Sequence, residues 1–180
     1  MPSREPVLRE MHVEDIPEVL EVQQPAAVAG LSAVFPQDEH PFPRQVIAER
    51  WLAEVSAGDT SCFVICRDGQ VAGFVAVRGD EVLHFGAALE EWGSGLAVAA
   101  HDEIVDVLRH RGLSRARLRV YAANPRGRRF WEKLGWRPTG ESSRGSMPPH
   151  AELLTYELAL DRRSPEAISP STSSVDLTSP

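Results

Sequence analysis

The chain has 180 residues, of which 42% are hydrophobic, and this length and composition predict one domain with its own core. A net charge of −7 excludes a general nucleic-acid binder, because neutralising phosphates requires clustered lysines and arginines. No run approaches the roughly eighteen consecutive apolar residues that cross a bilayer, and residues 1–5 lack the apolar stretch of a signal peptide, so we expect a cytoplasmic protein.

The first part of the chain carries short helix and strand patterns around one long irregular segment. Residues 24–44 hold four prolines among mixed aromatic and acidic residues, which predicts a loop without secondary structure. Further on, the Asp68-Gly69 pair predicts the tight turn of a hairpin. In chain order, the periodicity predicts a strand at 7–10, helices at 13–22 and 45–55, and strands at 62–66 and 70–77.

The only two cysteines, Cys62 and Cys66, lie four residues apart in one of these predicted strands. At the rise of a strand they are separated by roughly 13 Å, which is too far for a disulfide bond. We therefore expect two reduced thiols in the core rather than a redox or metal site.

A glycine-rich loop at residues 92–97 separates a strand-like run at 82–89 from a helical run that ends near His110. Glycines let the backbone turn sharply and approach a ligand, and the free amides at the start of a helix carry a partial positive charge. Gly93, Gly95 and the amides that follow them therefore predict a phosphate site. A tight turn packed under the helix is the structural alternative.

The rest of the chain predicts a strand, a short helix, a last strand and a tail. Residues 116–121 alternate polar and apolar side chains, and the helical run at 126–134 is followed by a glycine. Residues 152–160 alternate well enough for a final strand. Beyond them serine, threonine and proline dominate, and such a composition cannot offset the entropy of ordering. We therefore expect one domain over residues 1–160 and a disordered tail at 161–180.

Two of these segments resemble motifs of the GNAT superfamily of acetyl-CoA-dependent N-acetyltransferases. The family's acyl-CoA loop, Gln/Arg-x-x-Gly-x-Gly/Ala, is matched by residues 92–97 with a tryptophan in place of Gln or Arg. The family's pattern Asn-x-x-Ala-x-x-Phe-Tyr-Glu-Lys-Leu-Gly-Phe is matched by residues 124–136, with Gly127 for alanine and Trp131 for tyrosine. Order and spacing both agree, and the likeness covers residues 7–160.

The resemblance implies an α/β fold of the α+β kind, with a mixed, mainly antiparallel twisted sheet that is flanked by helices and splayed at the acyl-CoA site. It implies transfer of an acetyl group from acetyl-CoA to a primary amine of a small molecule or peptide, by direct attack in a ternary complex. A catalytically silent acyl-CoA-binding module and a protein-interaction domain without a ligand are the alternatives. We expect no nucleic-acid, membrane or metal partner, and the sheet edges could mediate a homodimer.

The same resemblance assigns residues to the coenzyme. The backbones of Ala87 and Ala88 are expected to pair with the pantetheine, and Asn124 to face it from the next strand. The three arginines within 126–129 are expected to meet the phosphates, although a solvated face explains them as well. The full expected acyl-CoA set is Ala87, Ala88, Leu89, Trp92, Gly93, Ser94, Gly95, Leu96, Ala97, Asn124, Arg126, Arg129 and Trp131.

The acceptor amine must lose a proton, because an alkylammonium with a pKa near 10.4 is only about 0.04% free amine at pH 7. The resemblance favours Glu81 as the base, since some family members carry a glutamate about six residues before the position of Ala87; the alternative is a solvated turn residue. His84 is the second candidate base, or else a structural histidine. Because Trp131 cannot donate a proton as tyrosine does, Tyr121 is the candidate acid for the thiolate, unless none is needed.

The sequence does not identify the acceptor. Asp38, Glu39 and His40 in the long loop could attract an amine or could simply be solvated. Phe35 and Trp51 could line a pocket or fill the core.

Overall fold

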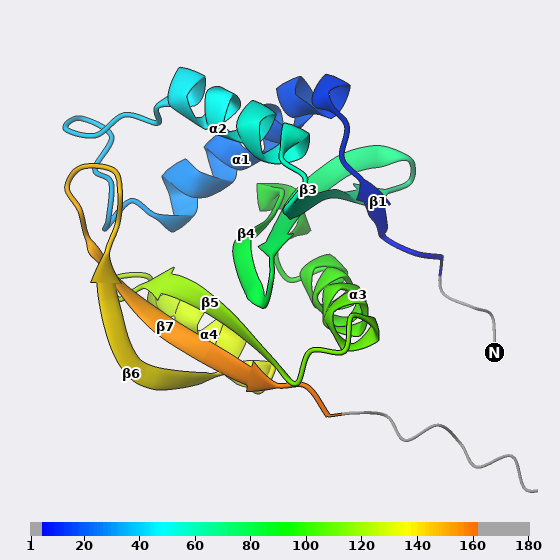
Figure 1. Ribbon diagram of the computed structural model, residues 1–180. Helices are drawn as coiled ribbons and strands as arrows, with labels where there is room; N and C mark the ends of the chain where they lie inside the picture. The colour runs from blue at the N-terminus through cyan, green and yellow to red at the C-terminus, as the bar shows by residue number, and fades with distance from the viewer. Residues whose placement is uncertain (1–4, 162–180) are drawn as a thin grey trace, which may run out of the picture.

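The computed structural model describes residues 5–161, which form a seven-stranded sheet of order β1-β2-β3-β4-β5-β7-β6 with helices on both faces (Figure 1). The greater part of the predicted tail, residues 162–180, lies outside this range. No helix within 5–161 has the length and apolar character to cross a membrane. In chain order the elements are β1 (Leu8–Glu10), η1 (Val13–Asp15), α1 (Ile16–Gly30), α2 (Arg44–Ser56), β2 (Thr60–Arg67), β3 (Gln70–Arg78), β4 (Glu81–Ala87), η2 (Leu89–Glu91), α3 (Leu96–His110), β5 (Arg115–Tyr121), α4 (Pro125–Lys133), β6 (Arg137–Arg144) and β7 (Glu152–Ala159).

The sheet is antiparallel except at its centre, where β4 and β5 run parallel. Only two residue pairs, at Glu81 and Val82 of β4, join these strands, although β4 continues to Ala87 and β5 to Tyr121. The two strands therefore diverge toward their C-terminal ends, and Figure 1 shows β5, β7 and β6 turned away from β4. The predicted mixed, mainly antiparallel and splayed sheet is confirmed.

Each face of the sheet is covered by two helices, and the spacing of apolar residues explains which side chains they bury. On one face, α3 turns Leu96, Ala100, Ile104 and Leu108 toward the strands, and α4 packs beside it. On the other face, α1 and α2 bury a second cluster around Trp51, which is fully inaccessible to solvent. Trp51 therefore fills the core, which settles one of the two alternatives for that residue.

A β-bulge in β4 decides which of its side chains reach each face. Val82 pairs with Val77 and His84 pairs with Ala76, so Leu83 is an extra residue in β4. Val82 lies in the α3 core, whereas Leu83 and His84 both face α1 and α2. Strict alternation would place His84 on the same face as Val82, so the bulge is what turns the imidazole toward α2.

The first helix is longer than predicted. α1 continues through Pro25 to Gly30, where the sequence indicated an irregular loop. Proline cannot donate a helical hydrogen bond, so its presence predicted a break. Arg44 of α2 donates to the side chains of Glu21 and Gln24 and ties this part of α1 to its neighbour. Contacts with α2 therefore hold α1 just before Pro25, although the local sequence does not favour continuation of the helix through that proline.

No pattern in the sequence predicts β6. Its residues, RPTGESSR, lack apolar alternation, and nearly all of them are exposed because the strand lies at the edge and pairs with β7 alone. The run predicted as a strand at 82–89 also ends early, at Ala87, and passes into η2. Apolar periodicity identifies strands that contact a core, so an exposed edge strand escapes it.

The two cysteines lie on β2 as free thiols. Cys62 is buried, as predicted, whereas Cys66 is partly exposed and only packs against the edge of the α1–α2 cluster. Burial raises the pKa of the Cys62 thiol to about 11. A thiol that stays protonated at neutral pH is a poor nucleophile, so Cys62 does not suggest covalent catalysis.

Candidate active site

The predicted phosphate loop lies between β4 and α3, at the end of β4 that has parted from β5. Gly93 and Gly95 have φ angles of 81° and 90°, in the left-handed region that favours glycine. A Cβ at either position would meet no atom within 4 Å, so conformation rather than crowding requires glycine. The Leu96 amide donates to Ser94 Oγ at 3.2 Å, and the amides of the next residues lack partners within the helix. These features suit the binding of an anion.

Arg67, the last residue of β2, adds a cation to this loop. Its Nε lies 2.9 Å from Oε1 of Glu91, and its Nη2 donates to Ser94 Oγ at 3.3 Å. Sequence reasoning missed Arg67 because it precedes Ser94 by 27 residues and only the pairing of the strands brings them together. The Asp68-Gly69 hairpin that follows Arg67 is the one signal that could have suggested it.

Trp92, which stands where the family has Gln or Arg, connects both sides of the strand divergence. Its Nε1 donates to the carbonyl of Ala87 at 3.2 Å, on the β4 side. The guanidinium carbon of Arg126, from the first turn of α4, lies 3.5 Å from the centre of the indole ring. A Cβ at Gly30 would lie 3.4 Å from the same ring, so α1 also contacts it. Trp92 therefore links β4, α1 and α4.

The backbone groups expected to meet the pantetheine have partners of their own. The amide of Ala88 donates to the Ala72 carbonyl at 2.8 Å. Asn124 caps α4, because its Oδ1 accepts from the Gly127 amide at 3.0 Å. A Cβ at Gly127 would lie 2.5 Å from Asn124 Nδ2, which explains glycine where the family has alanine. The expected coenzyme contacts of Ala87, Ala88 and Asn124 stay predictions.

The structure distinguishes the three arginines within 126–129, which the sequence alone does not rank as phosphate ligands. Arg128 points away from the loop, donating to the Tyr156 hydroxyl at 3.2 Å and to the Ala122 carbonyl at 3.4 Å. Arg126 and Arg129 are exposed and so accessible to a phosphate. Four arginines of α3 and β5 are instead paired with acids, in the ion pairs Arg109–Asp106, Arg115–Glu157, Arg117–Asp80 and Arg119–Glu81.

Trp131 belongs to an aromatic cluster between β4, α3 and α4. It is buried, with its ring centre 5.0 Å from that of Phe85, 4.9 Å from Phe130 and 5.5 Å from Trp136. Edge-to-face packing of this kind stabilises the contact of α4 with β4. The cluster gives Trp131 a structural role, beside which its expected contact with the coenzyme stays a prediction.

Glu81, the first candidate base, lies at the closed end of the divergence, where β4 and β5 are still paired. Arg119 Nε donates to its Oε1 at 2.8 Å. The carboxylate is thus held by a cation of the neighbouring strand, six residues before the end of β4. Its Oε1 is therefore already occupied by a hydrogen bond from Arg119.

His84, the second candidate base, forms a pair with Glu54 of α2, a residue that sequence reasoning missed. Its Nε2 lies 2.9 Å from both carboxylate oxygens, but only the contact with Oε1 has hydrogen-bond geometry. Burial raises the pKa of Glu54, yet the hydrogen bond from His84 and the charges of Arg50 and Arg78 outweigh it, so the net pKa is below its usual value. The missed signal is a carboxylate three residues after buried Trp51, on the core-facing side of α2.

Tyr121 ends β5 on the face that α1 and α2 cover. Burial raises the pKa of its hydroxyl, against the opposing charges of Arg50 and Arg119. Phe35 packs on its ring edge to face, with centres 5.5 Å apart. The expectation that Tyr121 reaches the region of Trp131 is not met, because alternate residues of β5 face α3 and α4 and Tyr121 does not.

The long loop between α1 and α2 exposes Asp38 and Glu39, in keeping with a solvated acidic turn. Phe35, in contrast, turns inward onto Tyr121, near the open end of β5. Of the loop residues considered from sequence, only Phe35 thus contacts a candidate catalytic residue.

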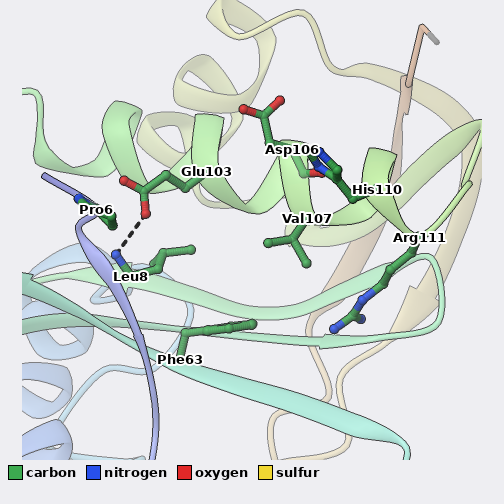
Figure 2. A pocket seen from close by; sticks show the side chains of 8 residues that line it. All are labelled: Pro6, Leu8, Phe63, Glu103, Asp106, Val107, His110 and Arg111. Atoms are coloured by element: carbon green, nitrogen blue, oxygen red, sulfur yellow. Dashed lines mark hydrogen bonds between the residues drawn. The ribbon is translucent and has the colours of Figure 1, made fainter. Parts of the chain in front are cut away.

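An open groove lies away from these residues, between α3 and the β1 edge of the sheet (Figure 2). Leu8, Phe63 and Val107 supply apolar side chains to it. Both oxygens of Glu103 are already used, since they accept from the amides of Val7 and Leu8 at 2.8 and 2.9 Å. The groove therefore marks the attachment of β1 to α3, and it contains none of the predicted site residues.

Comparison with known proteins identifies the fold independently. Residues 19–136 match the family model described as acetyltransferase (GNAT) family. A GCN5-related N-acetyltransferase structure from Rhodopseudomonas palustris is 18% identical, with a TM-score of 0.71 over 89% of this chain and 99% of that one. The ribosomal-protein-S18-alanine N-acetyltransferase of Escherichia coli is 18% identical, with a TM-score of 0.63 over 90% and 97%. Spermidine N-acetyltransferase from Vibrio cholerae, in complex with CoA and spermine, is 15% identical, with a TM-score of 0.64 over 85% of this chain and 94% of that one. No curated protein matches the sequence.

Proposed function

The chain belongs to the GNAT acetyltransferase family, and from that premise we propose that it moves an acetyl group from acetyl-CoA to a primary amine of a small molecule or peptide by direct attack in a ternary complex. The observation that carries the proposal is the divergence of β4 and β5, with the glycine loop at its open end. Holding both reactants there supplies rate, since effective molarities reach roughly 10⁵ M.

The coenzyme phosphates are assigned to the loop and the cations around it. Gly93 and Gly95 leave the start of α3 uncovered, and the helix dipole favours negative charge there. Arg67 touches the loop directly, and exposed Arg126 and Arg129 lie on the facing helix α4. Arg126 must then exchange its contact with Trp92 for a phosphate, or bind the phosphate while still stacked.

For the base, the geometry favours His84 over Glu81. With Glu54 ionised, the proton of the imidazole lies on Nε2, and Nδ1 is left as the acceptor for a proton of the incoming ammonium. The carboxylate then stabilises the imidazolium that forms. Glu81 instead has its carboxylate held by Arg119.

The reaction is balanced with these groups alone. His84 takes a proton from the ammonium, the freed amine attacks the thioester carbonyl, an N–C bond forms and the C–S bond breaks. A thiolate with a pKa near 8.5 leaves without an obligatory acid, which is compatible with Trp131 at the position of the family's tyrosine. Tyr121, on the same face as His84, remains the candidate proton donor if one is used.

The runner-up function is a silent acyl-CoA-binding module, and burial of Trp131 in the aromatic cluster is the observation that favours it.

Two measurements distinguish the transferase from the silent module. The first is calorimetric titration of the protein with acetyl-CoA, for which we expect micromolar binding. Release of free thiol is then followed with a panel of amines. Thiol release that depends on the amine supports the transferase, binding without release supports the silent module, and no binding at high concentration contradicts both.

A further inference from the structure

Helix α2 carries two opposite charges, Arg50 and Glu54, that form no ion pair with each other. Nε of Arg50 and Oε2 of Glu54 are both buried, and neither has a hydrogen-bond partner within the described residues. Arg50 takes part in none of the ion pairs found within residues 5–161. A buried charge without a partner is costly, so a native structure that keeps one usually uses it.

The two residues reach toward different sides of the strand divergence. Glu54 contacts β4 through His84, which lies 2.9 Å from its carboxylate. Arg50 is close enough to Tyr121, at the open end of β5, for each to influence the ionisation of the other. The pair therefore stands over the region where β4 and β5 have separated, on the face opposite α3 and α4.

The surroundings of Arg50 favour the binding of an anion. Burial lowers the pKa of its guanidinium, and the neighbouring groups of Glu54 and Tyr121 oppose that effect. A guanidinium nevertheless stays protonated in proteins, and its planar fork of donors fits a carboxylate. Tyr121 is a neutral phenol at pH 7, since burial raises its pKa further. Glu54 is already engaged by His84, so the guanidinium keeps donors for a ligand.

The carboxylate of Glu54 favours the binding of a cation next to Arg50. Its Oε1 accepts from Nε2 of His84. Its Oε2 lies 2.9 Å from the same nitrogen but accepts no hydrogen bond within the described residues, so it can accept one from an ammonium. Residues four apart on a helix have Cβ atoms about 5–6 Å apart, so one small molecule can reach both side chains. The complement of this pair is a zwitterion whose positive and negative groups are a few bonds apart.

We propose that the acceptor is a small amino acid, with its carboxylate bound by Arg50 and its ammonium received by Oε2 of Glu54. This inference rests on the proposed acetyl transfer and names its substrate class. The ammonium binds first at Oε2 of Glu54. As the nitrogen moves on toward the thioester, Nδ1 of His84 takes its proton, the amine attacks the carbonyl, and the C–S bond breaks to release the thiolate. Arg50 is a specificity residue in this scheme, because it binds a group that does not react.

The test compares each common L-amino acid with its own carboxamide, which keeps the amine and removes the negative charge. Thiol release gives kcat/KM for both members of every pair, with spermidine as an amine that lacks a carboxylate. We expect at least one amino acid to exceed its carboxamide by about 10- to 100-fold, the range for a hydrogen bond to a charged group. Arg50→Gln should abolish that preference by lowering kcat/KM with the acid, so that the acid and its carboxamide react with similar kcat/KM.

Arg44→Gln is the matched control, since Arg44 lies on the same helix but is paired with Glu21 and Gln24. It should keep the preference for the acid. Equal rates with acids and carboxamides in the natural protein, or a preference that survives Arg50→Gln, would overturn the proposal while leaving acetyl transfer intact.

A binding measurement separates this proposal from failure of the proposed function. If no amine of any kind releases thiol, acetyl transfer is wrong, and the amino acids and carboxamides are titrated by calorimetry into the protein saturated with CoA. Binding of an amino acid that its carboxamide and the Arg50→Gln variant both lack supports the site. Absence of any such binding contradicts it. Unchanged circular dichroism of the variant shows that the fold is retained.

Discussion

The two faces of the sheet differ in how their functional residues are arranged along the chain. On the coenzyme side, the glycine loop and the first turn of α4 are each a contiguous segment, 92–97 and 124–129. On the proposed acceptor side, Arg50 and Glu54 come from α2, and His84 comes from β4 after its bulge. A contiguous motif is visible in a sequence, whereas a set of residues assembled from two distant elements appears only when the fold is known.

The difference also separates what belongs to a family from what belongs to this chain. Phosphate binding at a helix start depends on backbone amides, which many sequences provide once glycines permit the turn. Recognition of an acceptor depends on particular side chains and their unpaired atoms, which in the proposed site are Nε of Arg50 and Oε2 of Glu54. Substitutions that alter acceptor recognition but not coenzyme binding, or the reverse, therefore test whether the two faces have separate roles.

The largest effect is expected on the acceptor side. His84→Gln keeps a donor for Glu54 but removes the base, so kcat should fall by about 10²- to 10⁴-fold, the usual range for a general base. Steady-state thiol release measures kcat, and calorimetry should show unchanged affinity for acetyl-CoA, because His84 faces α2 rather than the glycine loop. If His84→Gln lowered the affinity for acetyl-CoA as much as it lowers kcat, the proposed separation of coenzyme and acceptor residues would be wrong.

Glu81→Gln is the matched test of the other candidate base. Its carboxylate bonds to Arg119, so the substitution removes an ion pair and should lower kcat only a few-fold. If Glu81 is the base instead, the order of the two variants reverses. The pH profile of kcat/KM distinguishes them further, because only the true base removes the acidic limb of the profile when it is substituted.

The next effect belongs to the coenzyme side. Gly95→Glu places a negative side chain at the start of α3 and forces a non-glycine residue to φ of 90°, so we expect acetyl-CoA affinity to fall by about 100-fold or more, equivalent to about 2.7 kcal/mol. Gly112→Glu is the control, since Gly112 also has positive φ, 79°, and open space but follows the other end of α3. Equal loss in both variants, measured by calorimetry, would assign the effect to backbone strain.

These expectations show which part of the molecule could be predicted from sequence. The helix α3, the hairpin of β2 and β3, and the glycine loop follow from local periodicity and turn residues, and all are present. The extension of α1 past Pro25 and the exposed strand β6 do not follow, because tertiary contacts and edge pairing leave no apolar signal. Glu54 was missed for a related reason, since its partner His84 reaches it only through an extra residue in β4.

A smaller effect tests which arginines serve the coenzyme. Arg126→Gln should lower acetyl-CoA affinity by about 5- to 30-fold, because one exposed charge contributes modestly to phosphate binding. The loss should diminish at high salt, which screens exposed charges. Arg109→Gln is the control, since Arg109 is paired with Asp106 near the far end of α3. An equal loss in both variants would indicate a diffuse field rather than a contact at the loop.

The smallest effect concerns stability and contrasts the buried histidine of the coenzyme side with His84. His101 Nε2 accepts from Trp136 Nε1 at 3.0 Å, so its proton lies on Nδ1, 3.0 Å from Asp102 Oδ1. Burial lowers the pKa of His101 below its ordinary value of 6.5, although Asp102 opposes this. Protonation of Nε2 would also break the bond from Trp136.

The sign of the resulting pH dependence follows from which state binds the proton. Below about pH 6.5 the unfolded chain protonates His101 while the folded protein keeps it neutral, so this residue lowers the free energy of unfolding as pH falls. The slope is at most about 1.4 kcal/mol per pH unit, and it ends once the pH passes the folded pKa. Urea unfolding at pH 5.5 and 7.5 measures it, and His101→Gln, which retains an acceptor for Trp136, should reduce the difference between the two pH values. An equal difference in both proteins would mean that other groups, on either side of the sheet, carry the acid sensitivity.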